Sequence, residues 1–274
     1  MTENVKTKKL IKPTFSVITI TLNNMDGLQK TFKSVEKQSF RDFEWLVIDG
    51  GSTDESVAYL KKQKQNPVNE FFIRYTSKED DGIYDAMNKG MQYANGHYLI
   101  FMNAGDQFAD DNVLKTLAKH TEKRPDFIYG DALETTKNRR KAIAKTASRY
   151  KDLPWGMFTH HQAMLYNRRT LKALDIHYSQ LYTIASDYDF TARFLAQAEK
   201  IVYIPKPICI FEHGGISQQQ AFKGRREQYL IRERLEMVSV GENVMIFLAQ
   251  SISWTLKTRV PWLHAFLTAL RTKK

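Results

Sequence analysis

The stretch EWLVIDGGSTD at residues 44–54 decides the fold, because it joins an apolar run to a turn rich in glycine and acidic residues. Residues 44–48 have the composition of a short buried strand. The turn that follows, residues 49–54, carries the residues that favour tight turns and helix starts, and it predicts a helix from about residue 55 to 64. The stretch therefore predicts one strand, one sharp turn and one helix in succession.

The same alternation continues on both sides of this stretch. On the N-terminal side a strand and a helix are predicted, and on the C-terminal side a strand, a helix and a strand: 15–22, 28–38, 71–76, 84–94 and 98–102. Strands that alternate with helices at this pitch predict βαβ units and a mostly parallel sheet flanked by helices. In such α/β folds, ligands bind beyond the carboxyl ends of the strands. We therefore expect the functional residues at that edge.

The pattern is less regular after Asp106. Six further segments are predicted there: a helix at 114–120, a strand at 127–129, a charged hairpin at 131–149, a helix at 187–198, a strand at 201–204 ended by Pro205, and helices from 218 onward. We expect a disordered basic arm at 1–12, a catalytic domain at 13–217, and a helical extension at 218–274.

Composition restricts the class of protein. The chain has 274 residues, 41 basic and 30 acidic, which gives a net charge of +11. The single cysteine, Cys209, excludes an intramolecular disulfide or a zinc site built from several cysteines, and it favours the cytoplasm. The most apolar segment, residues 244–256, is interrupted by polar residues, so no membrane-spanning helix is expected.

Two polar clusters follow predicted strands. The Asp49 carboxylate can accept a hydrogen bond from the imide N–H of a uracil ring, although Asp49, Ser52 and Asp54 could equally cap the next helix. The run NAGD at residues 103–106 suits a metal–diphosphate site, because its small residues admit phosphates and Asp106 offers a hard oxygen ligand. An ordinary β-turn is the alternative for this run.

A third cluster, SDYD at residues 186–189, stands at a predicted helix start. Asp187 is the candidate general base there, because a helix N-terminus favours an ionised carboxylate. The alternative is helix capping by Ser186 or Asp187. Asp189 lies two positions further on, so the two aspartates cannot share one helix face, and only one should point into the site.

These features, taken in order, resemble family 2 of the inverting glycosyltransferases, which have the nucleotide-diphospho-sugar-binding GT-A fold. The matching stretches are ITLN at 20–23, VIDGGSTD at 47–54, GIYDAMNKG at 82–90, NAGD at 103–106 and SDYD at 186–189. The resemblance runs from about residue 15 to 217. It is closest to bacterial exopolysaccharide enzymes, including colanic-acid biosynthesis transferases.

The resemblance implies a role for each matching residue. The residues that would bind the nucleoside are Thr21, Asn23 and Asp49, and those that would line the donor pocket are Asp85, Asn88, Asn103 and Gly105. Asp106 would hold manganese or magnesium, with His213 as a further ligand. Asp187 would be the base. Asn103 replaces the first aspartate of the family's metal motif, so one carboxylate instead of two meets the cation. Trp155 and His161 are candidate acceptor contacts, with a partly buried loop as the alternative.

The expected activity is inverting transfer of a sugar from a nucleotide-diphospho-sugar, with UDP-sugar favoured, to a hydroxyl of a glycan or a lipid-linked acceptor. A nucleotide-sugar-binding protein without turnover is one alternative. A basic nucleic-acid-binding protein is another, and it is disfavoured because no helix-turn-helix, RNA-recognition or zinc-finger signature is found.

Positive charge concentrates near the C-terminus. From Ala221 onward there are ten basic and four acidic residues, a net charge of +6, interleaved with apolar residues and tryptophans. This pattern suits peripheral attachment to the anionic inner face of the cell membrane, where a lipid-linked acceptor would be found. The alternative is packing on the catalytic domain or on a second copy of the chain as a homodimer.

Overall fold

Four parallel strands form the first half of the sheet. The computed structural model describes residues 12–67, 69, 71–135, 142–212 and 215–259. In it, β1 (Phe15–Thr21), β2 (Phe43–Asp49), β3 (Phe72–Ser77) and β4 (Tyr98–Phe101) lie in the order β3-β2-β1-β4, all parallel. Each predicted strand and helix of this half is present within a few residues of its expected bounds.

The second half of the sheet is mixed. Its strands are β5 (Gln107–Phe108), β6 (Phe127–Thr135), β7 (Ile143–Lys145), β8 (Met164–Asn167) and β9 (Ile201–Glu212). The order continues β4-β8-β6-β9-β5, with β7 paired to β6. The pair β6–β9 is parallel, as are the first four strands, whereas β8 is antiparallel to β4 and β6, and β5 is antiparallel to β9. The predicted hairpin corresponds to the antiparallel pair β6–β7.

The prediction that Pro205 ends the last strand is wrong. Strand β9 continues to Glu212 and pairs with β6 along most of its length. The pairing register shifts around Asp131, beside the two prolines Pro205 and Pro207. Proline lacks the N–H that a regular ladder needs, and sheets accept it at such irregularities. The register shift therefore explains how one strand passes through both prolines.

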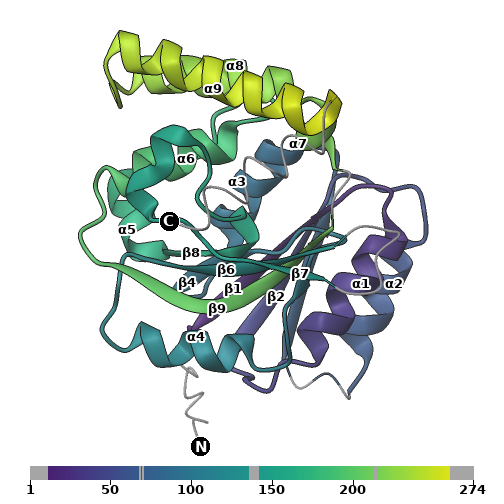
Figure 1. Cartoon of the computed structure of the whole chain (residues 1–274). Helices are drawn as coiled ribbons and strands as arrows, with labels where there is room; N and C mark the ends of the chain where they lie inside the picture. The colour runs from purple at the N-terminus through teal and green to yellow at the C-terminus, as the bar shows by residue number, and fades with distance from the viewer. Residues whose placement is uncertain (1–11, 68, 70, 136–141, 213–214, 260–274) are drawn as a thin grey trace, which may run out of the picture.

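Helices cover both faces of the sheet (Figure 1). The helices are α1 (Met25–Glu36), α2 (Ser56–Gln65), α3 (Ile83–Tyr93), α4 (Val113–Thr121), α5 (Arg168–Leu174), α6 (Ser186–Leu195), α7 (Ile216–Gln219), α8 (Ala221–Arg234) and α9 (Val240–Arg259), with short 3₁₀ turns η1 (Tyr150–Trp155) and η2 (His161–Ala163). One apolar core packs α1, α2 and α4 against one face, and a second packs α3, α5, α6 and α8 against the other. The chain thus has the predicted α/β architecture in three layers.

Helices α8 and α9 lie side by side across one end of the molecule (Figure 1). Arg232 on α8 is fully buried, and its Nε donates to the Oδ1 of Asn243 on α9 at 2.7 Å. Another Arg232 nitrogen lies 3.3 Å from the carbonyl of Pro154, so helices α8 and α9 are also fixed to η1. Of the helices within residues 12–259, none combines the length and hydropathy that spanning a membrane requires.

Candidate active site

The predicted nucleoside contacts lie at the carboxyl ends of neighbouring strands. Thr21 of β1 stands opposite Asp49 of β2 in the ladder, and the loops that follow these strands are joined by hydrogen bonds. Asn23 adopts a positive φ of 48°, which asparagine tolerates better than most residues. Its N–H donates to Ser52 Oγ at 2.8 Å, and its Oδ1 accepts the N–H of Thr53 at 2.8 Å. Asn23 thereby fixes one loop to the other.

The Asp49 carboxylate is completely buried and well supplied with donors. Its Oδ2 accepts from the hydroxyl of Ser77 at 2.6 Å and from the N–H groups of Gly51 and Ser52 at 3.3 and 3.0 Å, and its Oδ1 accepts from the hydroxyl of Ser52. A carboxylate has about four acceptor positions. Asp49 therefore shapes its own loop and anchors it to β3, and a base N–H would have to share or displace one of these donors.

The turn at residues 103–106 is held by a buried threonine of α1. The Thr31 hydroxyl lies 2.7 Å from the carbonyl of Asp106 and 3.1 Å from that of Asn103, and it accepts the N–H of Gly105 at 3.0 Å. Gly105 has a φ of +110°, and a Cβ placed on it would have no described atom within 4 Å. The turn is thus rigid on its inner side and open on the other, as a phosphate-binding turn requires.

Asp106 contacts a residue that was not predicted. The Nε2 of Gln162, in η2, donates to Asp106 Oδ2 at 2.7 Å, and Gln162 is only 3% exposed. Burial raises the pKa of Asp106 to about 7, although this hydrogen bond opposes the rise. Three side-chain oxygens at this edge of the sheet are buried and have no hydrogen-bond partner among the described residues: Thr21 Oγ1, Asn103 Oδ1 and Gln162 Oε1.

This donor set fits a divalent cation in its chemistry. Mg²⁺ and Mn²⁺ prefer carboxylate and amide oxygens. Asp106 offers the carboxylate, and the unpaired oxygens of Asn103 and Gln162 offer two neutral ligands. Within the described residues no group of three or more His, Cys, Asp or Glu side chains is placed to hold a metal. His213, the other predicted ligand, lies outside the described residues.

Asp187 stands in the first turn of α6, close to His161. Its Oδ1 accepts the N–H of Tyr188 at 2.8 Å, and its Oδ2 lies 3.9 Å from Nδ1 of His161. Burial raises the pKa of Asp187 to about 6, and the nearby charge of Glu227 adds to this. Burial, with His160 nearby, lowers the pKa of His161 to about 4, so its ring is neutral at pH 7. The other ring nitrogen of His161 lies 3.5 Å from the amide nitrogen of Asn103.

Asp106 and Asp187 are therefore linked through consecutive residues. Gln162 contacts Asp106, and His161 lies between Asn103 and Asp187. The 3₁₀ turn η2 that carries both residues contacts β4, β6 and β9. Two carboxyl groups from chain positions 81 residues apart thus face the same short turn. The arrangement suits a reaction in which one carboxyl binds the leaving group and the other receives a proton.

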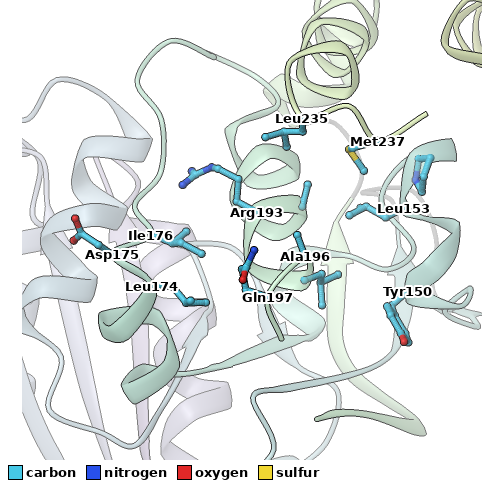
Figure 2. Close-up of a pocket in the computed structure, with 13 residues that line it drawn as sticks. Tyr150, Leu153, Leu174, Asp175, Ile176, Arg193, Ala196, Gln197, Leu235 and Met237 are labelled. Atoms are coloured by element: carbon cyan, nitrogen blue, oxygen red, sulfur yellow. The ribbon is translucent and has the colours of Figure 1, made fainter. Parts of the chain in front are cut away.

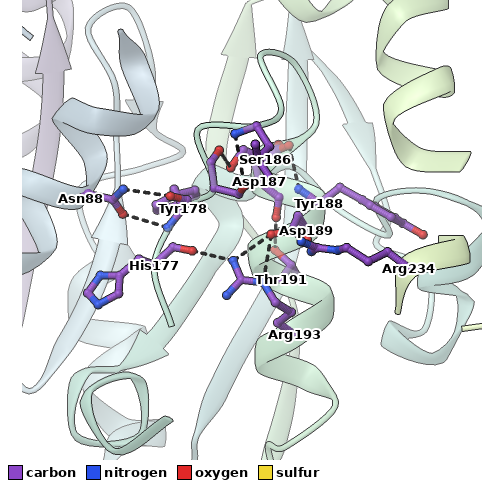
Figure 3. Close-up of polar contacts among 12 residues, drawn as sticks. Asn88, His177, Tyr178, Ser186, Asp187, Tyr188, Asp189, Thr191, Arg193 and Arg234 are labelled. Atoms are coloured by element: carbon purple, nitrogen blue, oxygen red, sulfur yellow. Dashed lines mark hydrogen bonds and ion pairs between the residues drawn. The ribbon is translucent and has the colours of Figure 1, made fainter. Parts of the chain in front are cut away.

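Asp189 has a different environment from Asp187. It is fully buried and forms ion pairs with Arg193 of α6 and Arg234 of α8 (Figure 3). An aspartate enclosed by two guanidinium groups is a structural ion-pair partner. Of the two aspartates, Asp187 is the one that remains available to the site, and its role as base stays a prediction.

Asp85 and Asn88 are engaged in contacts that fix the scaffold. The Asp85 carboxylate pairs with Lys89 at 2.7 Å, and this contact lowers its pKa. The Asn88 amide makes two hydrogen bonds to the main chain of Tyr178, at 2.8 and 2.9 Å (Figure 3). Both residues line a cavity of about 700 Å³ next to α5. Asn88 thus holds the segment before α6 in place, and contact of either residue with a donor stays a prediction.

Trp155 makes its contacts with other parts of the chain than Asp106 and Asp187 do. It is 53% exposed, and its carbonyl accepts from Gln250 of α9 at 2.9 Å. Among the described residues, no hydrogen bond, ion pair or ring contact joins it to Asp106 or Asp187. A second cavity of about 700 Å³ lies beside the C-terminal half of α6 (Figure 2). Its lining is largely apolar and includes Leu153, Ala196 and Met237 but none of the predicted site residues.

The chain is similar in sequence to known glycosyltransferases. The family model described as "Glycosyl transferase family 2" matches residues 16–180. A PGL/p-HBAD biosynthesis glycosyltransferase of Mycobacterium bovis is 31% identical over 209 residues, 75% of this chain and 79% of that protein. An uncharacterized glycosyltransferase of Mycobacterium tuberculosis is 46% identical over 103 residues, and the match spans 37% of the length of each.

Two solved structures are similar in fold. S. aureus TarS (residues 1–349, in complex with UDP-GlcNAc) superposes with a TM-score of 0.66 at 18% identity, over 90% of this chain and 76% of that one. The mannosyltransferase PcManGT of Pyrobaculum calidifontis, in complex with GDP-Man and Mn²⁺, superposes with a TM-score of 0.61 at 13% identity, over 96% and 81%. At these identities the likeness concerns the fold alone.

Proposed function

Since the chain belongs to glycosyl transferase family 2, we propose that it transfers a sugar, with inversion, from a UDP-sugar to a hydroxyl of a glycan or lipid-linked acceptor in bacterial surface polysaccharide synthesis. The observation that carries the proposal is the pair of carboxyl groups joined through His161 and Gln162. The fold neighbours that hold UDP-GlcNAc and GDP-Man support a nucleotide-sugar donor.

The donor end of the site consists of the open turn at Gly105 and the oxygens around Asp106. Asp106, Asn103 and Gln162 are the residues that would hold a manganese or magnesium ion. Such an ion, when bound, offsets the negative charge that develops on the departing nucleotide diphosphate. Thr31 and Gly105 keep the turn in a conformation that leaves room for the phosphates.

The acceptor end of the site depends on Asp187. As the acceptor oxygen forms its bond to the anomeric carbon, its proton passes to the Asp187 carboxylate, and the bond from sugar to diphosphate breaks on the opposite side. A single displacement of this kind inverts the anomeric centre. A pKa of about 6 leaves most Asp187 ionised at pH 7 while keeping it a useful base, and general bases contribute about 10²–10⁴-fold to rate. The neutral His161 beside it adds no competing positive charge at this pH.

Two measurements test the proposal. A thermal-shift panel of nucleotide-sugars with and without Mn²⁺ should identify a donor, because ligand at hundredfold excess over its Kd adds ~2.7 kcal/mol to stability. Donor hydrolysis and transfer are then compared for the native chain and Asp187→Asn. We expect donor binding to be retained and turnover to fall by about 10²-fold or more. Equal turnover would contradict the role of Asp187, and a native chain that binds donor without turnover would point to a nucleotide-sugar-binding protein.

We further propose that α8 and α9 attach the enzyme to the anionic inner face of the cell membrane. Exposed apolar side chains recur every fourth residue along α9, at Val244, Leu248 and Ile252. Exposed Lys223 and Arg226 of α8 add positive charge. Apolar side chains combined with basic ones favour binding to anionic lipid surfaces. A lipid-linked acceptor would then be presented at the surface on which the enzyme rests.

A further inference from the structure

A glutamate of α8 binds the loop that leads into the helix of Asp187. Glu227 is only 8% exposed. Its Oε1 accepts the N–H and hydroxyl of Thr183 at 3.2 and 3.1 Å, and its Oε2 accepts the N–H groups of Ile184 and Ala185 at 2.9 and 2.8 Å. One carboxylate thus takes three consecutive backbone N–H groups and one hydroxyl. All of its acceptor positions are used within this loop.

These hydrogen bonds end at Ala185, the N-cap residue of α6. The N-cap of α6 is Ala185, whose methyl side chain cannot accept a hydrogen bond. Unsatisfied N–H groups at a helix start are usually bound by a Ser, Thr, Asp or Asn at this position. The N–H of Ala185 itself is bound by a carboxylate of another helix, 42 residues further along the chain, while the N–H of Tyr188 in the first turn is bound by Asp187. Asp187 lies only two residues after Ala185.

The loop is also held from its opposite side and packed closely by α8. The Tyr84 hydroxyl of α3 donates to the carbonyl of Ile184 at 2.8 Å. Gly224, one turn before Glu227, lies so close to the loop that a Cβ there would meet Ile184 Cγ2 at 3.1 Å. Two turns after Glu227, Arg234 pairs with Asp189 of α6 (Figure 3). Helix α8 therefore contacts the loop before Asp187 and, after Asp187, the helix α6 itself.

We propose that Glu227 is a positioning residue, which sets the place of Asp187 for proton transfer by fixing the loop at residues 183–185. This inference rests on the proposed function and extends it to the C-terminal helices, which become part of the catalytic apparatus. Glu227 touches neither Asp187 nor the reacting atoms directly. It acts through the three residues before α6.

Glu227 also acts on Asp187 electrostatically. Its negative charge raises the pKa of Asp187, in addition to the larger effect of burial. The other titratable groups that face Asp187 are Tyr84 from α3, His161 from η2, and the buried Tyr166 and Tyr178. All four are uncharged at neutral pH, because burial raises the pKa values of the tyrosines and lowers that of His161. Glu227 is therefore the charged group near Asp187 whose removal should move the acid limb of the pH–rate profile.

Two variants separate the position of the carboxylate from its charge. Glu227→Gln keeps the side-chain size, removes the charge and turns an NH₂ group toward backbone donors. We expect kcat to fall on the order of 10–100-fold, with donor KM within about twofold, and the acid limb of kcat to move to lower pH. Glu227→Asp keeps the charge and withdraws the carboxylate by one methylene, so kcat should fall while the acid limb stays. Glu233→Gln, an exposed glutamate on the same helix, is the matched control.

Backbone amide hydrogen exchange provides a readout that needs no turnover. The amides of residues 183–188 should exchange faster in Glu227→Gln than in Glu233→Gln. If the native chain proves inactive, the proposed function fails, and faster exchange still shows that Glu227 holds this loop. Unchanged exchange overturns the inference, and so does a loss of kcat in Glu227→Gln without movement of the acid limb, because a general loss of stability would explain it.

Discussion

At the scale of single residues, the site keeps two carboxyl groups where burial favours their protonated forms. The pKa is raised to about 7 for Asp106 and to about 6 for Asp187. For such a carboxyl, the folded chain binds protons more tightly than the unfolded chain. The stability it contributes is present below the ordinary pKa of 3.8 and is lost as pH rises through the folded value. Strongly shifted groups of this kind are typical of functional sites.

The raised pKa of Asp187 predicts the pH dependence of the reaction. A general base must be ionised, so kcat should be level above pH 7 and fall about tenfold per pH unit below about pH 6. His161, with a pKa near 4, stays neutral through this window and should not contribute. The same carboxyl disfavours the folded state above pH 6, so Asp187→Asn should be more stable than the native chain at pH 8 although less active. Rate profiles and urea unfolding at pH 5 and 8 measure both effects. A level kcat down to pH 5 would exclude Asp187 as the titrating base.

We expect Gln162 to affect how strongly the site binds a cation. If its oxygen supplements Asp106, then Gln162→Glu should strengthen Mn²⁺ binding and Gln162→Leu should weaken it, each by about tenfold. Mn²⁺ binding is followed by electron paramagnetic resonance in the absence of donor. Gln197→Glu adds the same charge at the cavity beside the C-terminal half of α6 and serves as the control. Indistinguishable affinities in the two Gln162 variants would mean that this amide only orients Asp106.

At the scale of secondary-structure elements, helix α3 shows how one motif builds the scaffold. Residues 82–90 form most of this helix, and two of their side chains hold other segments: Tyr84 binds Ile184 and Asn88 binds Tyr178. Asp85 pairs with Lys89 within the helix. Gly90 lies so close to β1 that a Cβ would meet Ile18 Cγ2 at 2.6 Å. The motif therefore brings α3 onto the sheet and fixes the segment before α6.

A pair of glycine substitutions tests this close packing. Gly90→Ala should lower the free energy of unfolding by about 1–3 kcal/mol, because the buried interface with β1 has no space for the methyl group. Gly241→Ala, in the exposed first turn of α9 with no described atom within 4 Å of the new Cβ, should raise it by up to about 0.5–1 kcal/mol. Urea unfolding of both variants gives the comparison. Equal stability of the two would show that α3 can move off the sheet without cost.

The sequence predicted the elements whose signals are local. Strands β1 to β4 with their helices follow from apolar periodicity and turn residues within short windows. The continuation of β9 through Pro205 did not follow, because the register shift beside Asp131 depends on β6, some 70 residues earlier in the chain. Short β8 and α5 were missed for a related reason. Strand β8 is determined by its pairing with β4 and β6 more than by its own composition, and α5 packs against β8.

The same distinction applies to the candidate site. The acidic residues were found because each follows a strand or begins a helix. Gln162, Thr31 and Glu227 were not found, because their partners lie 42 to 75 residues away in the chain. A weak signal existed for Thr31, a polar residue on the otherwise apolar buried face of α1. Glu227 looked like one charge among many in a basic segment.

At the scale of the whole molecule, the C-terminal helices connect the catalytic core to the outer surface. On its inner side α8 holds the loop before Asp187 through Glu227, and Ile231 packs within the core cluster that contains Phe190 and Phe194. On its outer side, with α9, it exposes apolar and basic residues. Removing residues from Gly241 onward would also remove Asn243, the buried partner of Arg232. Point substitutions on the exposed side are therefore the sharper probe.

The double variant Leu248→Glu, Ile252→Glu tests attachment to lipid. These side chains are 53% and 60% exposed, so the substitutions should leave the fold and donor hydrolysis unchanged. In co-sedimentation with vesicles of phosphatidylcholine and phosphatidylglycerol, binding should fall by about tenfold or more, because two apolar anchors are replaced by charges that the anionic surface repels. Phe72→Glu, an equally exposed apolar residue on the edge strand β3, should bind as the native chain does. If the double variant sediments like the native chain, the membrane proposal fails. A different result is also informative: the native chain does not bind vesicles and sediments as a dimer, whereas the double variant sediments as a monomer. In that case this face of α9 binds a second copy of the chain.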